Sequence, residues 1–238
     1  MSKKKLYLTI LFSVTAVCIM GSIIYRNINS IKQAFSRSKI ETMEEDTSDN
    51  KKYFEKELSE FSSIKVDSDI MAVHIKHGSS YGLNCTYSKS ILKPVISLQN
   101  GQLFVTQNLP VNYLPSNLKC TLEITVPRFS SLNQIEITTD VGGMNLEDLT
   151  VKKLKTKSDV GAIRIKNVEF NSLDAHSDVG AINISLLDSV DNYSMDVESD
   201  VGAVNVASKK VKHNSFSQNS GSGKSLTVST NVGAININ

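Results

Sequence analysis

The sequence contains no tryptophan, and only 6% of its 238 residues are aromatic. A conventional globular core usually relies on more large rings than this. We therefore expect a core of Val, Ile, Leu and small residues, which suits stacked β-strands. Hydrophobic residues make up 40% of the chain and charged residues 21%, a composition typical of a folded rather than a disordered protein.

The larger part of the chain also lacks an excess of charge of either sign. Residues 1–61 hold ten Lys or Arg and eight Asp or Glu, whereas residues 62–238 hold sixteen of each. A nucleic-acid-binding domain shows a basic excess on its folded part. The balance therefore argues against a nucleic acid as the partner.

Motifs of known catalytic or cofactor sites are missing as well. The sequence has neither a Gly-x-Ser-x-Gly nucleophile elbow nor a phosphate-binding glycine loop. The histidines share no motif, and exposed polar side chains are the simplest interpretation of them. They are His74, His77, His176 and His213. We predict that the protein is not an enzyme, needs no cofactor and has no catalytic, cofactor-binding or metal-ligating residue.

Cysteine is scarce, with three residues in the chain. Cys18 lies in an apolar stretch, whereas Cys85 and Cys120 lie in strand-like segments. In a domain outside the cell the latter two could form a disulfide. The alternative is two independently buried thiols, and the sequence does not decide because it does not show whether the two strands are neighbours.

The N-terminal part contains a long apolar run. Residues 6–25 carry no charge and lie between a cluster of three lysines and Arg26. This is about the length that a helix needs to cross a bilayer. A cleaved signal peptide fits less well because no Ala-x-Ala-like site follows, and Val17 makes Cys18 a poor lipoprotein site. Basic residues flank both ends, but the tight lysine cluster favours a cytoplasmic tail at 1–5, a transmembrane helix at 6–25 and an extracytoplasmic C-terminal domain.

Residues 26–60 are predicted to form a juxtamembrane spacer. Residues 31–43 have the pattern of a short amphipathic helix, and residues 41–50 are acidic and polar, as in a linker. Residues 51–61 place their apolar side chains at approximately helical spacing. This last segment is expected either to cap the following domain or to belong to a partly ordered stalk.

An internal repeat dominates the rest of the sequence. Five segments share a turn of the Ser-Asp-Val-Gly-Ala type, and their acidic positions are 19, 19, 22 and 31 residues apart. The segments are 135–146 (IEITTDVGGMNL), 154–165 (LKTKSDVGAIRI), 173–184 (LDAHSDVGAINI), 195–206 (MDVESDVGAVNV) and 226–237 (LTVSTNVGAINI). A sixth, degenerate copy at 64–75 has Asp69 in the acidic position and Met71 in place of glycine. The repeat domain is therefore predicted to span residues 61–238.

Each copy predicts a strand, a tight turn and a second strand. Apolar and polar residues alternate on both sides of the turn, so that one face of each strand is buried. In the turn, we expect Asp to accept hydrogen bonds from its own downstream amides and Gly to adopt a positive φ. A period of 19 residues is too short for a strand–helix–strand unit. We predict an all-β fold, a single-domain β-solenoid with about 19–22 residues per turn and parallel, in-register strands.

The longer intervals between copies are predicted to hold insertions. Residues 76–126 contain strand-like runs at 82–87, 95–98, 103–106 and 118–126. Asn100 and Gly101 form a tight-turn signal between the middle pair. Residues 207–223 are polar and rich in Ser, Gly and Lys, which is typical of a loop.

These motifs resemble the bacterial “putative adhesin” β-strand-repeat family of uncharacterised envelope domains, which is related to the head-GIN adhesin domains. The matching features are an Ile-x-Val strand at 64–66, Asn-Gly-x-Leu at 100–103, Leu-x-Ile-x-Val-Pro at 122–127 and the Gly-Ala-Ile turns. The resemblance covers about residues 62–238. It implies a bacterial envelope protein, since some members are membrane-anchored and linked to envelope-stress gene clusters, and it brings no catalytic residues.

Two groups of side chains are candidates for binding. Stacked turns would place the repeated acids in one column, which invites a cation such as calcium. Turn formation is the preferred interpretation, because each turn offers a single carboxylate. Lysine stripes could contact anionic envelope polymers or lipid headgroups, or only solvate a sheet face. The acids are Asp140, Asp159, Asp178 and Asp200, with Asn231 in the last copy; the stripes are Lys152, Lys153, Lys155 and Lys157, and Lys209, Lys210 and Lys212.

Together these features favour a bacterial protein that crosses the cell membrane once and is not an enzyme. Its β-solenoid is expected to bind a protein or an anionic envelope polymer, in adhesion or in the response to envelope stress. One alternative is a structural self-assembler, because the chain stops at Asn238 directly after a repeat strand and could stack through that end. A carbohydrate-active β-helix enzyme is disfavoured, because its site would need clustered acids, bases and aromatic platforms. We expect a functional surface first on residues 76–126, residues 207–223 or the lysine stripes.

Overall fold

The computed structural model describes residues 52–110, 117–211 and 213–238. The tail and transmembrane helix predicted at 1–25, and the spacer up to residue 51, lie outside the described residues. Within the described part, no helix has the length and apolar character needed to span a bilayer. The regular structure there is β-strand apart from two short 3-10 helices, η1 (Ser90–Leu92) and η2 (Val190–Asn192).

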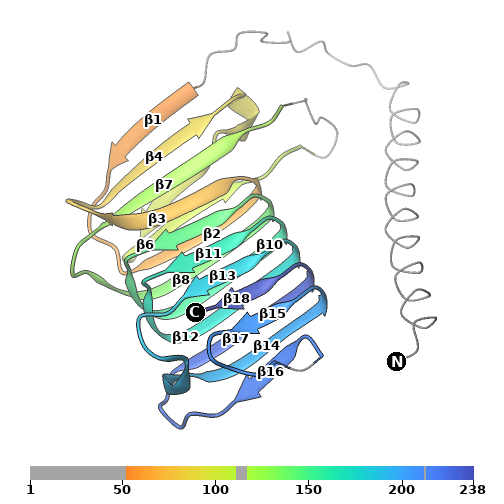
Figure 1. Ribbon diagram of the computed structural model, residues 1–238. Helices are drawn as coiled ribbons and strands as arrows, with labels where there is room; N and C mark the ends of the chain where they lie inside the picture. The colour runs from red at the N-terminus through yellow and green to blue at the C-terminus, as the bar shows by residue number, and fades with distance from the viewer. Residues whose placement is uncertain (1–51, 111–116, 212) are drawn as a thin grey trace, which may run out of the picture. The chain divides into compact units, whose positions relative to one another are not determined.

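The six repeat copies form six turns that stack side by side (Figure 1). The first strand of each turn lies in one nine-stranded sheet, called sheet B, and the second strand lies in another, called sheet A. The strands of adjacent turns are parallel and in register, so that Leu154 pairs with Ile135 on one side and Leu173 on the other. The strand pairs are β2 (Ser63–Ile70) and β3 (Ala72–Gly78), β8 (Ser131–Val141) and β9 (Met144–Glu147), β10 (Thr150–Val160) and β11 (Ile163–Lys166), β12 (Glu169–Val179) and β13 (Ile182–Ser185), β14 (Ser194–Val201) and β15 (Val204–Val206), and β17 (Ser225–Val232) and β18 (Ile235–Ile237). The prediction of an all-β fold with stacked repeat turns is confirmed.

The order of the turns in the stack differs from their order in the chain. The last copy, β17 and β18, lies between the β12–β13 turn and the β14–β15 turn and pairs with both. Residues 186–193, which include η2, therefore skip one position in the stack, and the last strands of the chain fill it. Our expectation that the last repeat strand forms a free end was wrong, and with it the basis for stacking through that end. The outermost turn there is β14–β15, and β16 (Ser215–Gln218) pairs antiparallel with β14.

The insertion at 76–126 forms the opposite end of the stack. Its four predicted strands are confirmed as β4 (Gly82–Tyr87), β5 (Val95–Gln99), β6 (Gln102–Gln107) and β7 (Cys120–Pro127). Strands β6 and β7 pair in parallel with β2 and β3 and so continue the stack, whereas β4 and β5 add antiparallel strands to the two sheets. Asn100 and Gly101 have φ of 51° and 72°, as a two-residue hairpin turn requires.

Two local expectations were wrong. Residues 52–57 form strand β1 (Lys52–Glu57), which pairs antiparallel with β4, rather than a helix. The apolar side chains that suggested a helix instead pack on the end of the domain: Phe54 lies 6.2 Å from Tyr87, ring centre to ring centre, and Phe61 is buried. Residues 207–223 are not wholly a loop, because they include β16.

The core lies between the two sheets and consists mainly of columns of aliphatic side chains. One column runs through Ile64, Ile135, Leu154, Leu173 and Leu226, each 2% exposed or less. Neighbouring members of a column are separated by one strand spacing of about 4.8 Å. Aliphatic side chains stack well at that spacing, which explains how the chain builds its core without tryptophan.

Candidate functional site

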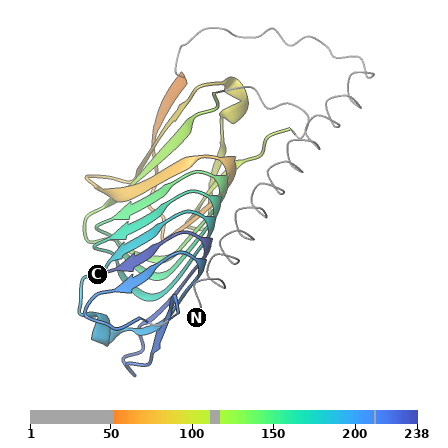
Figure 2. The same cartoon turned by 45° about the vertical axis from the view of Figure 1, so that its right-hand side comes forward.

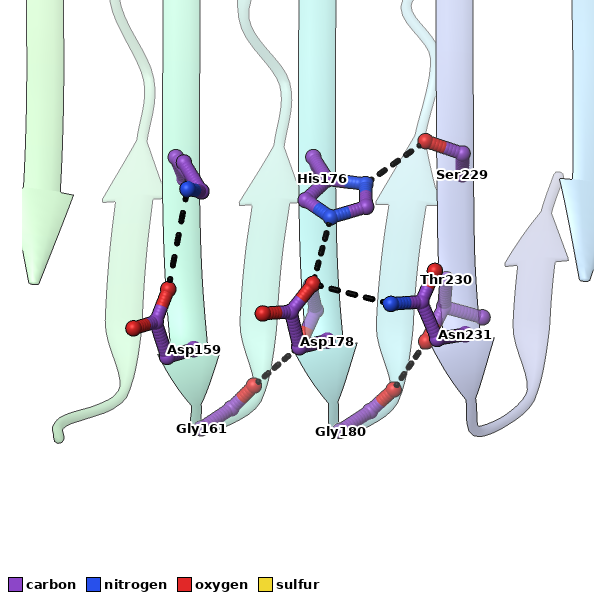
Figure 3. A network of polar contacts seen from close by, with 10 residues as sticks. Asp159, Gly161, His176, Asp178, Gly180, Ser229, Thr230 and Asn231 are labelled. Atoms are coloured by element: carbon purple, nitrogen blue, oxygen red, sulfur yellow. Dashed lines mark hydrogen bonds and ion pairs between the residues drawn. The ribbon is translucent and has the colours of Figure 1, made fainter. Parts of the chain in front are cut away.

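The corner between the two sheets is built in the same way in successive turns, and Figure 2 shows the corners aligned along one edge of the stack. The Ser or Thr before the acidic position points inward, and in four of the six corners it donates its hydroxyl hydrogen to the glycine carbonyl of the adjacent turn. Ser177 Oγ donates to Gly161 O at 3.0 Å, and Thr230 Oγ1 donates to Gly180 O at 3.2 Å (Figure 3). Ser158 and Ser199 make the equivalent bonds. These buried bonds fix the distance between neighbouring corners.

The corner glycine is needed for close approach, and the positive φ that we expected occurs among the repeat corners only at Gly202, with 158°. Gly161 and Gly180 do not have positive φ. A Cβ on Gly180 would lie 2.0 Å from Gly161 O, and one on Gly161 would lie 1.9 Å from Gly142 O. Each glycine thus faces the corner of the preceding turn in the stack. The first repeat corner has no repeat corner before it, and there the position is taken by the buried side chain of Met71.

The valine of each corner points outward and forms a continuous row. These side chains lie directly opposite one another in adjacent turns, and each is 41–52% exposed. In stack order they are Val141, Val160, Val179, Val232 and Val201, and Ile70 pairs with Val141 at one end. We call these six residues the valine row. Sequence reasoning missed it, because strand alternation continued from the buried Leu154, Thr156 and Ser158 would place Val160 inward, whereas it is exposed.

The repeated acids line up beside the valine row, but their contacts differ from those expected. The bonds that the structure shows for them do not go to their own downstream amides. Asp69 accepts from the amide of Leu109 at 2.5 Å, and Asp159 lies 3.7 Å from Lys157 Nζ. Asn231 takes the interior position between Asp178 and Asp200, where it reduces the repulsion between carboxylates.

The pKa of Asp140 shows that the carboxylates of the acidic column repel one another. Burial raises the pKa of this carboxyl above its ordinary value, and the negative charges of Asp159, Asp69 and Asp67 raise it further, while Lys157 lowers it. Within the described residues, no group of three or more His, Cys, Asp or Glu side chains is placed to hold a metal ion.

A polar network joins the last copy to its neighbour in the stack (Figure 3). His176 Nδ1 lies 2.8 Å from Ser229 Oγ, and His176 Nε2 lies 2.8 Å from Asp178 Oδ1. Asn231 Nδ2 donates to the same Asp178 oxygen at 3.0 Å. Sequence reasoning had treated His176 as an isolated polar residue, because nothing in the sequence indicates that residue 229 lies beside it.

Serine, histidine and aspartate in series are also the residues of hydrolase triads. Acyl transfer additionally needs free donors for an oxyanion. Ser229 lies in β17, which is paired in parallel on both sides, so the ladder occupies the amides around it. On the outer face of sheet B, the network therefore holds β12 and β17 of two adjacent turns together by hydrogen bonds.

The predicted lysine stripes lie at the surface, and some of their lysines face carboxylates. Lys153, Lys155 and Lys157 are exposed on β10, as strand alternation predicts. Lys155 lies between Glu136 and Asp174 in adjacent strands, and Lys157 faces Asp159. In the second stripe, Lys209 pairs with Asp191, and Lys212 lies outside the described residues. Part of the positive charge of each stripe is therefore paired within the domain.

The two cysteines of the domain lie on neighbouring strands. Cys85 on β4 and Cys120 on β7 are both buried, with their Sγ atoms 3.8 Å apart, and both are free thiols. The hydrogen bond between them, followed by burial, raises the pKa of the Cys85 thiol above its ordinary value.

Comparison with known proteins places the chain in a family. Residues 61–238 match the model of the Toastrack DUF4097 family. The chain belongs to this family. No curated protein matches the sequence.

Solved structures were compared with the chain, and one of them shares its fold. A “putative cell adhesion protein” from Clostridium sporogenes is 21% identical, and the match covers 79% of this chain and 99% of the other, with a TM-score of 0.65. A “putative adhesin” from Bacteroides fragilis is 18% identical over 80% of this chain and 98% of the other, with a TM-score of 0.37. The resemblance to an adhesin-type family of uncharacterised domains, drawn from the repeat motifs, is confirmed.

Proposed function

We propose that this Toastrack chain is a non-enzymatic envelope protein, anchored in the cell membrane by residues 6–25, whose stacked corners bind a partner protein outside the membrane. The valine row carries the proposal. Large apolar side chains in contiguous exposed patches are typical of interaction sites rather than of free surface. Five spacings of about 4.8 Å give the row a length of roughly 24 Å.

The surroundings of the valine row define the chemistry of the partner. The acidic column, with Asp140 and Asp159 at its centre, runs beside the valines on every turn but one. An anionic polymer or an anionic lipid surface would be repelled there. An elongated protein segment with apolar side chains on one side and basic side chains at its flank would be complementary. The name of the Clostridium sporogenes protein, which refers to cell adhesion, agrees with a binding role at the surface.

Site-specific photo-crosslinking in the native membrane tests this proposal and captures the partner whatever its identity. A photoreactive amino acid is placed in the full-length chain at Val160 or Val179, within the valine row. The matched control is Leu187, an isolated apolar residue of similar exposure (53%) outside the row.

We expect one adduct of the same size from both valine positions and no such adduct from Leu187. Adducts of equal yield from all three positions, or none from the valines, would overturn the proposal. Alkaline carbonate extraction of the same membranes tests the anchor, since a chain held by residues 6–25 stays with the membrane and a peripheral one is released.

A further inference from the structure

A second surface lies on the outer face of sheet A, where polar side chains form a row across the turns. In register, the row runs Asn145, Arg164, Asn183, Asn236 and Asn205. Asn205 Nδ2 donates to Asn236 Oδ1 at 2.9 Å, and Asn236 Nδ2 donates to Asn183 Oδ1 at 2.9 Å. These three side chains form an amide ladder, and each bond in it uses only one of the two N–H groups of an amide. The remaining donors and acceptors are available to a ligand.

The amide ladder forms part of an open groove of about 450 Å³. Arg164, Ser185 and Asn238 also line it, and Val206, Ala207 and Ile237 supply its apolar part. Its volume lies within the usual range of ligand sites, roughly 300–1,000 Å³. The groove is thus rich in hydrogen-bonding groups and carries the positive charge of Arg164.

Arg164 occupies the position that would extend the amide ladder from Asn183 towards Asn145. The equivalent residue is Asn in both neighbouring turns, Asn145 and Asn183. Among the described residues, no carboxylate lies within ion-pair distance of the Arg164 guanidinium. Arg164 does not donate to its neighbour Asn145 either, because Asn145 Oδ1 is buried without a hydrogen-bond partner. An asparagine at position 164 would continue the ladder. A residue that departs from the repeated asparagine, without a contact that stabilises the fold, is expected at a functional site.

We propose that this groove binds an anionic, hydroxyl-rich chain. The ladder amides would hydrogen-bond hydroxyl groups, and the Arg164 fork would pair with a carboxylate or a phosphate, the groups that a guanidinium binds in bidentate fashion. Uronic acid polymers and polyol phosphates share this chemistry. The site goes beyond the proposed function, because it lies on a sheet face and takes a polymer, whereas the valine row takes a protein.

Arg164→Asn is the diagnostic variant, because it removes the charge while completing the amide ladder. We expect it to melt no lower than the unmodified chain. Its matched control is Lys153→Asn, which removes the same charge from the exposed face of sheet B. Both variants, in the full-length chain in detergent, are titrated calorimetrically with three oligomers of equal length: an oligogalacturonate, an oligo(glycerol phosphate) and a neutral dextran.

The unmodified chain is expected to bind at least one of the two acidic oligomers more tightly than dextran. The acidic oligomer that it binds more tightly shows whether the ligand group is a carboxylate or a phosphate. Arg164→Asn should lower that affinity about tenfold to a hundredfold, as expected for a charge-assisted bond, and Lys153→Asn should leave it unchanged. An equal loss of affinity in both variants would show that the oligomer responds only to the net charge of the protein, and would overturn the inference. Absence of binding to both acidic oligomers would overturn it as well, while crosslinking at the valine row would still decide the proposed function.

Discussion

At the corner of a turn, four consecutive residues have different tasks. Ser177 points inward and bonds the preceding turn, and Asp178 and Val179 face outward. Gly180 has no side chain because the carbonyl of Gly161 in the preceding turn occupies that space. The recurring motif is therefore a folding device at its first and last positions. Its two middle positions form the surface that we propose to be functional.

Gly180→Ala tests the close approach at the corner. A Cβ there would lie 2.0 Å from Gly161 O, which belongs to backbone held in the ladder and cannot move away cheaply. We expect a loss of about 3 kcal/mol in the free energy of unfolding, measured by denaturant titration. Gly143→Ala is the control, because a Cβ there lies 3.4 Å from Ala162 O and the other full copies have alanine at this position. Similar losses in both variants would contradict the role assigned to Gly180.

Asp140→Asn tests the repulsion within the acidic column. The pKa of Asp140 in the folded state is raised above its unfolded value. The unmodified chain therefore loses stability as pH rises through that folded-state pKa, and the amide does not. We expect the variant to be the more stable one at about pH 7, with the difference disappearing near pH 3, where the carboxyl is protonated in both states.

Thermal melts at the two pH values measure this difference. Asp174→Asn serves as the control, since Asp174 lies between Lys155 and Thr227 and has no acidic neighbour in register. A stabilisation that is independent of pH, or one of equal size in the control, would show that charge repulsion is not the cause.

At the level of elements, the strands could be predicted but their order could not. The runs at 82–87 and 95–98 were placed correctly, because alternation and the Asn100-Gly101 turn are local signals. The order of the turns depends on pairing between copies, and all copies have the same alternation and register, so each could pair with any other. The interval of 22 residues and the substitution of Asn231 for aspartate were the only signs that a turn would be inserted later.

Engineered disulfides distinguish the two possible orders. His176 pairs directly with Ser229 across one strand spacing of about 4.8 Å, within the range for a disulfide. Glu198 lies one strand further on, at roughly twice that spacing and beyond that range. We expect His176→Cys with Ser229→Cys to cross-link on oxidation and His176→Cys with Glu198→Cys to remain reduced, as read by peptide mapping. The reverse result would mean that the turns stack in chain order.

For the candidate site, sequence reasoning found the acidic column and missed both the valine row and the groove on sheet A. Strand alternation continued from the buried Thr156 and Ser158 would place Val160 inward, so its exposure at the corner could not be derived from that pattern. The groove depends on Asn183 lying beside Asn236, and these residues are adjacent only because the last copy is inserted into the stack. Both surfaces are properties of the stack rather than of any single copy.

At the scale of the whole molecule, stacking converts one short motif into two long surfaces. A row of valines runs along the corners, and an amide ladder runs across sheet A. With both surfaces occupied as proposed, a single domain holds a protein and a polymer at fixed relative positions. The central claim is that the valines are exposed for a partner and not required by the fold.

The most direct test is the full-length triple variant Val160→Thr, Val179→Thr and Val232→Thr. Threonine keeps the β-branched shape that suits the strand but replaces one of the two methyl groups of each valine with a hydroxyl. We expect the free energy of unfolding to fall by no more than about 1 kcal/mol, and the adduct formed by a photoreactive residue at Val141 to disappear. Strong destabilisation, or an adduct that persists at full yield, would contradict the account.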